Sequence, residues 1–121
     1  MAEEATETRA ISPDRAAELI EAGAPALDVR EGYEFEGGHI PGARLVSLPD
    51  VQAEAEKLDK EQPVVFYCRS GDRSAMPADA LSAAGYDAYS IEGGLEAWAE
   101  SGRPLEPADG EVVVRSGLPP T

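Results

Sequence analysis

The stretch that decides the fold reads Pro63-Val64-Val65-Phe66-Tyr67-Cys68-Arg69-Ser70-Gly71-Asp72-Arg73-Ser74. Its first half, up to Cys68, is continuously apolar and rich in β-branched and aromatic residues, which predicts a strand buried on both faces. Its second half favours a loop, because polar, charged and glycine residues follow one another. An alanine-rich segment from 74 to 84, closed by Gly85, predicts a helix. We place Pro77 in the first turn of this helix, where a proline is tolerated.

Shorter helices and strands are predicted to alternate on both sides of this stretch. Ser12 is a good N-cap, Pro13 suits the first helical position, and Gly23 ends the helix that they begin. Apolar runs and helical spacing then predict strands at 26–29, 45–48 and 86–91 and helices at 31–36, 51–58 and 95–101. This alternation predicts an α/β domain with a small parallel sheet flanked by helices on both faces.

The chain length and its two ends predict one domain with polar extensions. The 121 residues fit a single domain, and we divide them into an acidic lead at 1–8, the domain at 9–105 and a tail at 106–121. Within the tail, Val112-Val113-Val114 is a candidate edge strand. The N-terminus lacks the basic and apolar regions of a signal peptide, and no apolar run could span a bilayer. We therefore expect a cytoplasmic protein, where a reducing environment keeps a free thiol usable.

Charge and cysteine content exclude several classes of function. The 24 acidic and 10 basic residues give a net charge of −14, which disfavours nucleic acids and anionic membranes as partners. The chain has one cysteine and one histidine, Cys68 and His39. It therefore has no internal disulfide and no zinc site built from several thiolates. We expect neither a metal nor a cofactor.

The segment after Cys68 has the features of an anion-binding loop that activates a thiol. Gly71 allows a tight curl, so that successive backbone N–H groups can point inward. Arg69 and Arg73 add positive charge, and the N-terminus of the following helix adds more. Such surroundings favour the thiolate of a cysteine. The alternative is an inert core cysteine, but two arginines and a glycine in a strand-to-helix loop favour the reactive one.

Several motifs, in this order along the chain, resemble the rhodanese family. The Cys68 to Ser74 loop resembles the active-site loop of that family. The other matching segments are Leu27-Asp28-Val29-Arg30-Glu31, Tyr33-Glu34-Phe35, Gly38-His39-Ile40-Pro41-Gly42-Ala43, Glu92-Gly93-Gly94 and Ala97-Trp98. Together they cover about residues 11 to 105. The resemblance implies a rhodanese-like fold and gives His39, within its turn, a structural role.

The resemblance also implies a function and a set of site residues. A rhodanese-type enzyme takes a sulfane sulfur from thiosulfate or a persulfide donor and passes it to a thiol, or to cyanide in an assay. By this likeness Cys68 is the catalytic residue that carries the sulfur as a persulfide. Asp28 and Arg30 form a charged support under the loop. The substrate-binding anion cradle consists of Arg69, Ser70, Gly71, Asp72, Arg73 and Ser74.

Three alternative functions remain to be weighed. Rhodanese-fold phosphatases have five residues between the cysteine and the arginine, whereas four lie between Cys68 and Arg73. The smaller loop fits a persulfide sulfur better than a phosphoryl group, so phosphatase activity ranks below sulfur transfer. A sulfur-relay module acting on a protein partner stays open. A non-catalytic binding module is disfavoured, because inactive members of the family commonly lack the cysteine.

Overall fold

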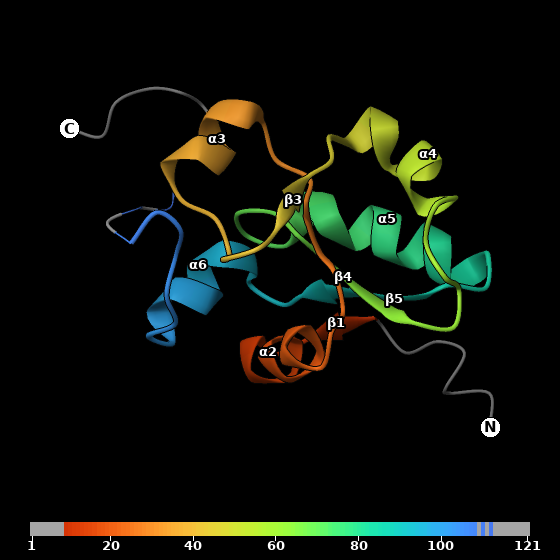
Figure 1. The fold of residues 1–121 in the computed structure, drawn as a ribbon, viewed down its shortest axis with the longest axis horizontal. Helices are drawn as coiled ribbons and strands as arrows, with labels where there is room; N and C mark the ends of the chain where they lie inside the picture. The colour runs from red at the N-terminus through yellow and green to blue at the C-terminus, as the bar shows by residue number, and fades with distance from the viewer. Residues whose placement is uncertain (1–8, 109, 111, 113–121) are drawn as a thin grey trace.

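The computed structural model describes residues 9–108, 110 and 112, and its centre is a five-stranded parallel sheet (Figure 1). The strands are β1 (Ala10–Ile11), β2 (Ala26–Asp28), β3 (Arg44–Leu45), β4 (Pro63–Tyr67) and β5 (Asp87–Ile91). Their spatial order is β1-β5-β4-β2-β3, and every pairing is parallel. The α/β fold with a small parallel sheet is therefore confirmed.

The strand β4 occupies the middle of the sheet, as its apolar sequence predicts. It pairs with β2 on one side, where Leu27 is opposite Phe66, and with β5 on the other, where Val64 is opposite Ala88. Its side chains alternate between two separate cores, because successive residues of a strand point to opposite faces. Val65 belongs to one core, and Val64 and Phe66 belong to the other.

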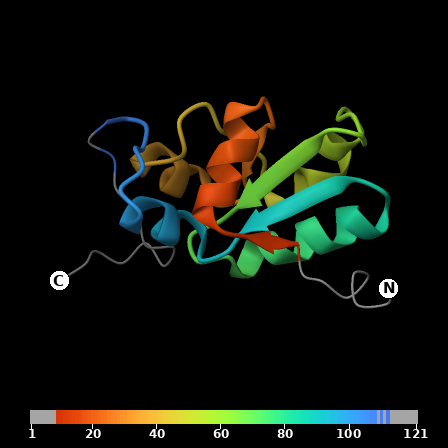
Figure 2. The same ribbon diagram turned by 90° about the horizontal axis from the view of Figure 1, so that it is seen from below.

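Helices cover both faces of the sheet, as predicted. Helices α2 (Pro13–Glu21) and α6 (Gly94–Glu100) pack on the face that carries Val65. Helices α4 (Val51–Ala55) and α5 (Asp72–Ala83) pack on the opposite face. Figure 1 shows α2 below the sheet and α4 and α5 above it, and Figure 2 shows β1, β5 and β4 running side by side. The short helix α3 (Gly32–Gly37) follows β2, and a 3-10 turn (Leu48–Asp50) precedes α4.

The start of α2 confirms the predicted cap. The Ser12 side chain accepts a hydrogen bond from the Arg15 N–H at 3.1 Å, and Pro13 is the first helical residue. The helix ends at Glu21, and Gly23 follows with φ +114°. Only glycine adopts that backbone conformation readily, so it turns the chain toward β2 without strain.

Helix α5 begins earlier than the sequence predicts. It starts at Asp72 rather than Ser74, because the curl of the loop already positions residue 72 for helical hydrogen bonding. Pro77 therefore lies inside the helix, and its predicted place in the first turn is wrong. A proline there leaves the carbonyl of Arg73, four residues before it, without an intrahelical N–H donor.

The edges of the sheet also differ from the prediction. The chain forms a strand, β1, at Ala10–Ile11. The sequence does not predict it, because two residues are too few to show an alternation of apolar and polar side chains. The expected strand at 45–48 reduces to Arg44–Leu45, because the 3-10 turn begins at Leu48. In the tail, Val112 packs against the core without strand structure, and the rest of the candidate edge strand lies outside the described residues.

The tail begins by crossing the loop at 37–42. His39 and Glu106 exchange backbone hydrogen bonds, with N···O distances of 3.1 and 2.8 Å, as a short antiparallel bridge. Gly110 lies against Gly37 and Gly38 so closely that an added Cβ would be 2.9 Å from the Gly37 carbonyl oxygen. Among the described residues, no helix is long and apolar enough to cross a membrane.

Candidate active site

The candidate site lies where the carboxyl ends of the three central strands meet. β2 ends at Asp28, β4 at Tyr67 and β5 at Ile91, and all three run in the same direction. Parallel strands present their ligand sites at this edge, because the loops that follow them converge there. The Cys68 loop follows β4, so the fold brings it beside the segments that follow β2 and β5.

The Cys68 sulfur lies inside a curl of hydrogen-bond donors. The backbone N–H groups of Gly71 and Arg73 lie 3.0 and 3.3 Å from Sγ, and the Ser74 hydroxyl lies at 3.6 Å. Gly71 makes the curl possible with φ +104°. The Ser74 hydroxyl in turn contacts the Ser90 hydroxyl at 2.7 Å. These donors lie at the N-terminus of the 12-residue helix α5, an arrangement that can bind an anion.

The backbone before the curl is held by the start of α6. The Leu95 and Glu96 N–H groups donate to the carbonyls of Cys68 and Arg69 at 2.8 and 3.0 Å. This approach requires a glycine at position 94, because a Cβ there would lie 2.5 Å from the Arg69 carbonyl oxygen. The Glu92-Gly93-Gly94 motif therefore fixes the Cys68 loop against α6.

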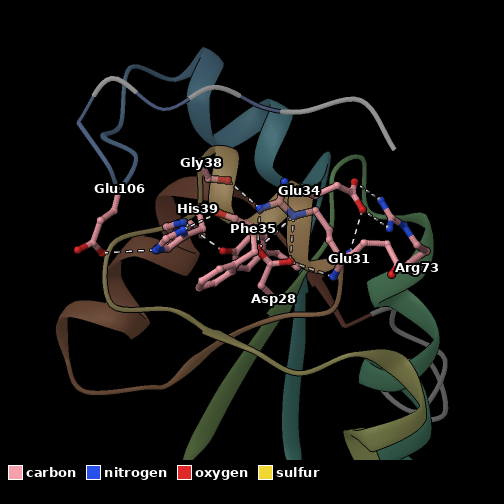
Figure 3. Close-up of polar contacts among 11 residues, drawn as sticks. Asp28, Glu31, Glu34, Phe35, Gly38, His39, Arg73 and Glu106 are labelled. Atoms are coloured by element: carbon pink, nitrogen blue, oxygen red, sulfur yellow. Dashed lines mark hydrogen bonds and ion pairs between the residues drawn. The ribbon is translucent and has the colours of Figure 1, made fainter. Parts of the chain in front are cut away.

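Arg73 forms a buried ion pair with Glu34 of α3 (Figure 3). Its two terminal nitrogens donate to the two Glu34 carboxylate oxygens at 3.0 and 3.1 Å, and the Glu34 side chain is 0% exposed. The Glu31 N–H donates to Glu34 as well, at 3.0 Å. The predicted role of Arg73 in binding an anion stays a prediction, and in the structure its guanidinium is occupied by Glu34.

The surroundings of this pair keep both partners charged. Burial raises the pKa of Glu34, but the hydrogen bonds from Arg73 and the Glu31 N–H outweigh it and hold that pKa below its ordinary value. The hydrogen bond to Glu34 raises the pKa of Arg73 further above its ordinary value, against the effect of burial. The pair therefore remains an ion pair throughout the neutral range.

Arg69, at the other end of the loop, forms an ion pair that is half-buried. Its guanidinium donates to the Glu96 carboxylate at 2.6 Å, and the two side chains are 33% and 43% exposed. Ser70 beside it is half-buried. The side chain of Asp72, a further member of the predicted cradle, lies outside the described residues.

Asp28 and Arg30 form a second buried pair at the end of β2, and their predicted role as a support for the Cys68 loop stays a prediction. Arg30 donates to both carboxylate oxygens of Asp28, at 2.9 and 2.7 Å, and both side chains are 0% exposed. Burial lowers the pKa of Arg30, but Asp28 outweighs it and keeps that pKa above the ordinary value. Arg30 also donates to the Gly38 carbonyl at 2.8 Å. These bonds fix the start of the 37–42 loop relative to β2.

His39 has the contacts of a structural residue. Its ring stacks on Phe35 with centroids 3.8 Å apart, and Nδ1 lies 2.7 Å from the Phe35 carbonyl oxygen (Figure 3). Next to it, the Ile40 N–H donates to the Tyr67 hydroxyl at 3.1 Å. In the part of the chain that the structure describes, no three His, Cys, Asp or Glu side chains gather as a metal site.

The structure adds two residues that the sequence reasoning left without a role. Glu34 belongs to the Tyr33-Glu34-Phe35 motif. The feature of the sequence that marks it is its spacing from Glu31, which is typical of a helix N-terminus, and the two residues form a reciprocal cap there. Ser90 is buried at 2% exposure beside Ser74, and its signal in the sequence is a hydroxyl between Tyr89 and Ile91 in a short strand. Both connect other elements to the Cys68 loop.

Comparison with known proteins gives the family. A family model described as a rhodanese-like domain matches residues 12–101. This chain belongs to the rhodanese-like family.

Two relatives illustrate the sequence similarity. The thiosulfate sulfurtransferase GlpE of Actinobacillus pleuropneumoniae is 36% identical over 100 residues, which cover 81% of this chain and 93% of GlpE. The uncharacterized protein YqhL of Bacillus subtilis is 38% identical over 76 residues, 62% of this chain and 60% of YqhL.

Solved structures agree with the rhodanese-like fold. A rhodanese-related protein from Thermoplasma volcanium superposes with a TM-score of 0.72 at 30% identity, over 80% of this chain and 96% of that protein. The sulfurtransferase relatives and the family model together support the rhodanese-type sulfurtransferase class for this chain.

Proposed function

We propose that this rhodanese-like protein transfers a sulfane sulfur through a persulfide on Cys68. The observation that carries the proposal is the convergence of the Gly71 and Arg73 N–H groups on the Cys68 Sγ, at 3.0 and 3.3 Å. These donors stabilise a thiolate before the reaction. After the reaction they stabilise the persulfide anion in the same way that an oxyanion hole stabilises a negatively charged oxygen.

The proposed reaction has two steps. The Cys68 thiolate attacks the outer sulfur of thiosulfate, the S–S bond of thiosulfate breaks, and sulfite leaves with the bonding electrons. An acceptor, a thiol in the cell or cyanide in an assay, then attacks the outer sulfur of the persulfide and restores the Cys68 thiolate. This is covalent ping-pong catalysis, and it needs neither a metal nor a general base when the thiol is already ionised.

Access to the sulfur requires a movement of the loop. Cys68 is 0% exposed, so a donor cannot touch Sγ while the curl is closed. The part that can move is the tip at Ser70 and Gly71, because α6 holds the carbonyls of Cys68 and Arg69, and Glu34 holds the Arg73 side chain.

The test is the mass of the intact protein before and after incubation with thiosulfate. We expect the wild type to gain one sulfur atom and to lose it again on addition of cyanide. The Cys68→Ser variant should gain none and should show no turnover. Turnover by Cys68→Ser at an appreciable fraction of the wild-type rate contradicts the covalent mechanism.

Phosphatase activity is the competing reaction that the loop disfavours. A phosphoryl group adds a phosphorus and three oxygens to the curl, whereas a persulfide adds one sulfur, and the Gly71 and Arg73 N–H groups already lie 3.0 and 3.3 Å from Sγ. The wild type should therefore transfer sulfur faster than it hydrolyses an aryl phosphate, and the reverse ranking contradicts the proposed function.

A further inference from the structure

Glu34 pairs with the guanidinium of Arg73, the arginine whose backbone N–H contacts the sulfur. The backbone N–H of Arg73 contacts Sγ, while its guanidinium is held by both oxygens of the fully buried Glu34 carboxylate. A buried bidentate pair of this kind is hard to open, because either charge alone would be left uncompensated. The anion site therefore contains the dipoles of the loop but little of the positive charge of Arg73.

The remaining arginine of the loop is also paired. Arg69 contacts Glu96 at 2.6 Å, although this pair is only half-buried and is screened by water. The chain as a whole carries a charge of −14. A donor that approaches Cys68 therefore meets a site whose two guanidinium groups are both balanced by carboxylates, within a protein that repels anions.

This balance matters because the two classes of sulfur donor differ in charge. With thiosulfate, the Cys68 thiolate and a dianion come together, and the products are a persulfide anion and a sulfite dianion. With an alkyl persulfide, the thiolate meets a monoanion, and the products are the same protein persulfide and an alkyl thiolate. In both reactions one S–S bond breaks and one forms without a redox change. The complex of the protein with an alkyl persulfide therefore carries one negative charge less than its complex with thiosulfate.

We propose that Glu34 is a specificity-determining residue that neutralises Arg73 and so favours singly charged persulfide donors over dianionic thiosulfate. The proposal rests on the sulfur-transfer function above and deepens it by naming the donor class. Glu34 acts through Arg73 and does not touch the donor itself. The low pKa of Glu34 agrees with this role, because the carboxylate stays charged over the pH range of the reaction.

The test is the Glu34→Gln variant of the full chain, assayed with thiosulfate and with the persulfide of 2-mercaptoethanol. Glutamine has the same shape and still accepts a hydrogen bond from Arg73, but it leaves the guanidinium charge uncancelled. We expect the ratio of kcat/KM for thiosulfate to kcat/KM for the persulfide to rise about tenfold, because the charge of Arg73 is then no longer cancelled and attracts the dianion more than the monoanion. An unchanged ratio overturns the proposal.

Two control variants show whether the effect comes through Arg73. The double variant Glu34→Gln/Arg73→Gln should return the ratio to that of the wild type, because it removes the uncancelled charge. The variant Glu96→Gln frees the half-buried Arg69 and should raise the ratio much less, because water already screens that pair. An equal rise in Glu96→Gln, or a rise that persists in the double variant, overturns the assignment to Glu34.

A measurement on the wild type keeps the proposal testable if Glu34→Gln does not fold. Added salt should raise kcat/KM for thiosulfate more than for the persulfide, because it screens a repulsive site. A fall with thiosulfate that persists in Arg69→Ala, where the Arg69 guanidinium cannot bind the donor, means that the Arg73 charge is not cancelled, and it overturns the proposal. If the wild type gains no sulfur from either donor, the sulfur-transfer function itself fails. If it gains sulfur from both with equal salt dependence, only the donor preference fails.

Discussion

The two ends of the Cys68 loop carry the same chemical group in opposite surroundings. Arg73 pairs with Glu34 at exposed fractions of 13% and 0%, whereas Arg69 pairs with Glu96 at 33% and 43%. Sequence alone cannot distinguish the two arginines, because each is a loop arginine with an acidic residue elsewhere in the chain. The partner decides the difference: Glu34 is a fully buried residue of α3, and Glu96 is a half-buried residue of α6.

This difference divides the loop into a fixed part and an adjustable part. Separating the buried pair exposes an uncompensated charge to a dry environment, which costs several kcal/mol. Separating the half-buried pair costs less than about 1 kcal/mol, because water replaces the partner. A donor can therefore recruit the Arg69 side chain at low cost, while Arg73 keeps its place and holds its backbone N–H on the sulfur.

The largest effect on stability is expected from Arg73→Ala. This change leaves Glu34 buried without its partner, and we expect the free energy of unfolding to fall by about 3 kcal/mol or more. Urea denaturation followed by circular dichroism measures it. The double variant Glu34→Leu/Arg73→Met should recover most of the loss, because two apolar side chains of similar size leave no charge uncompensated. A loss below about 1 kcal/mol in Arg73→Ala contradicts the buried character of the pair.

The second largest effect is expected from Gly94→Ala, which disturbs the main chain at the Arg69 end. The new Cβ meets the Arg69 carbonyl oxygen at 2.5 Å and the Cys68 carbonyl oxygen at 2.6 Å, and Gly94 has φ +62°. We expect the free energy of unfolding to fall by about 2–4 kcal/mol, because alanine is strained in the left-handed region and because the new Cβ displaces the backbone.

The matched control for this variant is Gly102→Ala. Gly102 has φ +88° but nothing within 4 Å of an added Cβ, so the substitution there carries the conformational strain alone. We expect the free energy of unfolding, measured with heat or urea, to fall by about 1–2 kcal/mol in Gly102→Ala. The additional loss in Gly94→Ala then measures the effect of the close approach of α6 to the loop. Equal losses in the two variants mean that this approach is unimportant.

The sequence predicted the parts of the structure that depend on local patterns. The alternation of apolar residues, the helix caps and the apolar runs located most strands and helices. The charged loop after an apolar strand also marked Cys68 as the candidate reactive residue, and its reactivity stays a prediction. The ordered motifs indicated the family. These signals are local, since each depends on residues within a few positions of one another.

The sequence could not predict the features that depend on contacts between distant segments. Glu34 and Arg73 are 39 positions apart, so no local pattern joins them. The two-residue strand β1 exists only because β5 provides a partner, with Ile11 opposite Ile91. The same limit explains Pro77, whose place inside α5 depends on where the Cys68 loop starts to curl.

The third prediction concerns stability at acid pH. The pKa of Glu34 is lowered in the folded protein, so its contribution is fully present above the ordinary glutamate pKa and is lost as the pH falls through the folded value. Glu34→Gln should therefore lose less stability than the wild type between neutral and acid pH, by about 1–2 kcal/mol. Urea midpoints measured across this range test it. An acid dependence in Glu34→Gln as steep as that of the wild type contradicts the prediction.

The smallest effect on stability is expected from Arg69→Ala. Because the Arg69 pair is only half-buried at both partners, we expect the free energy of unfolding to change by less than about 1 kcal/mol. Its effect on the reaction should be selective, since Arg69 is the guanidinium that can leave its carboxylate for an incoming anion. The rate of sulfur uptake from thiosulfate, measured by intact mass, should fall by a small factor, and uptake from a singly charged persulfide should fall less.

A stability loss as large as that of Arg73→Ala would remove the distinction between the two ends of the loop. Equal slowing with both donors would mean that Arg69 orders the loop rather than attracting the donor.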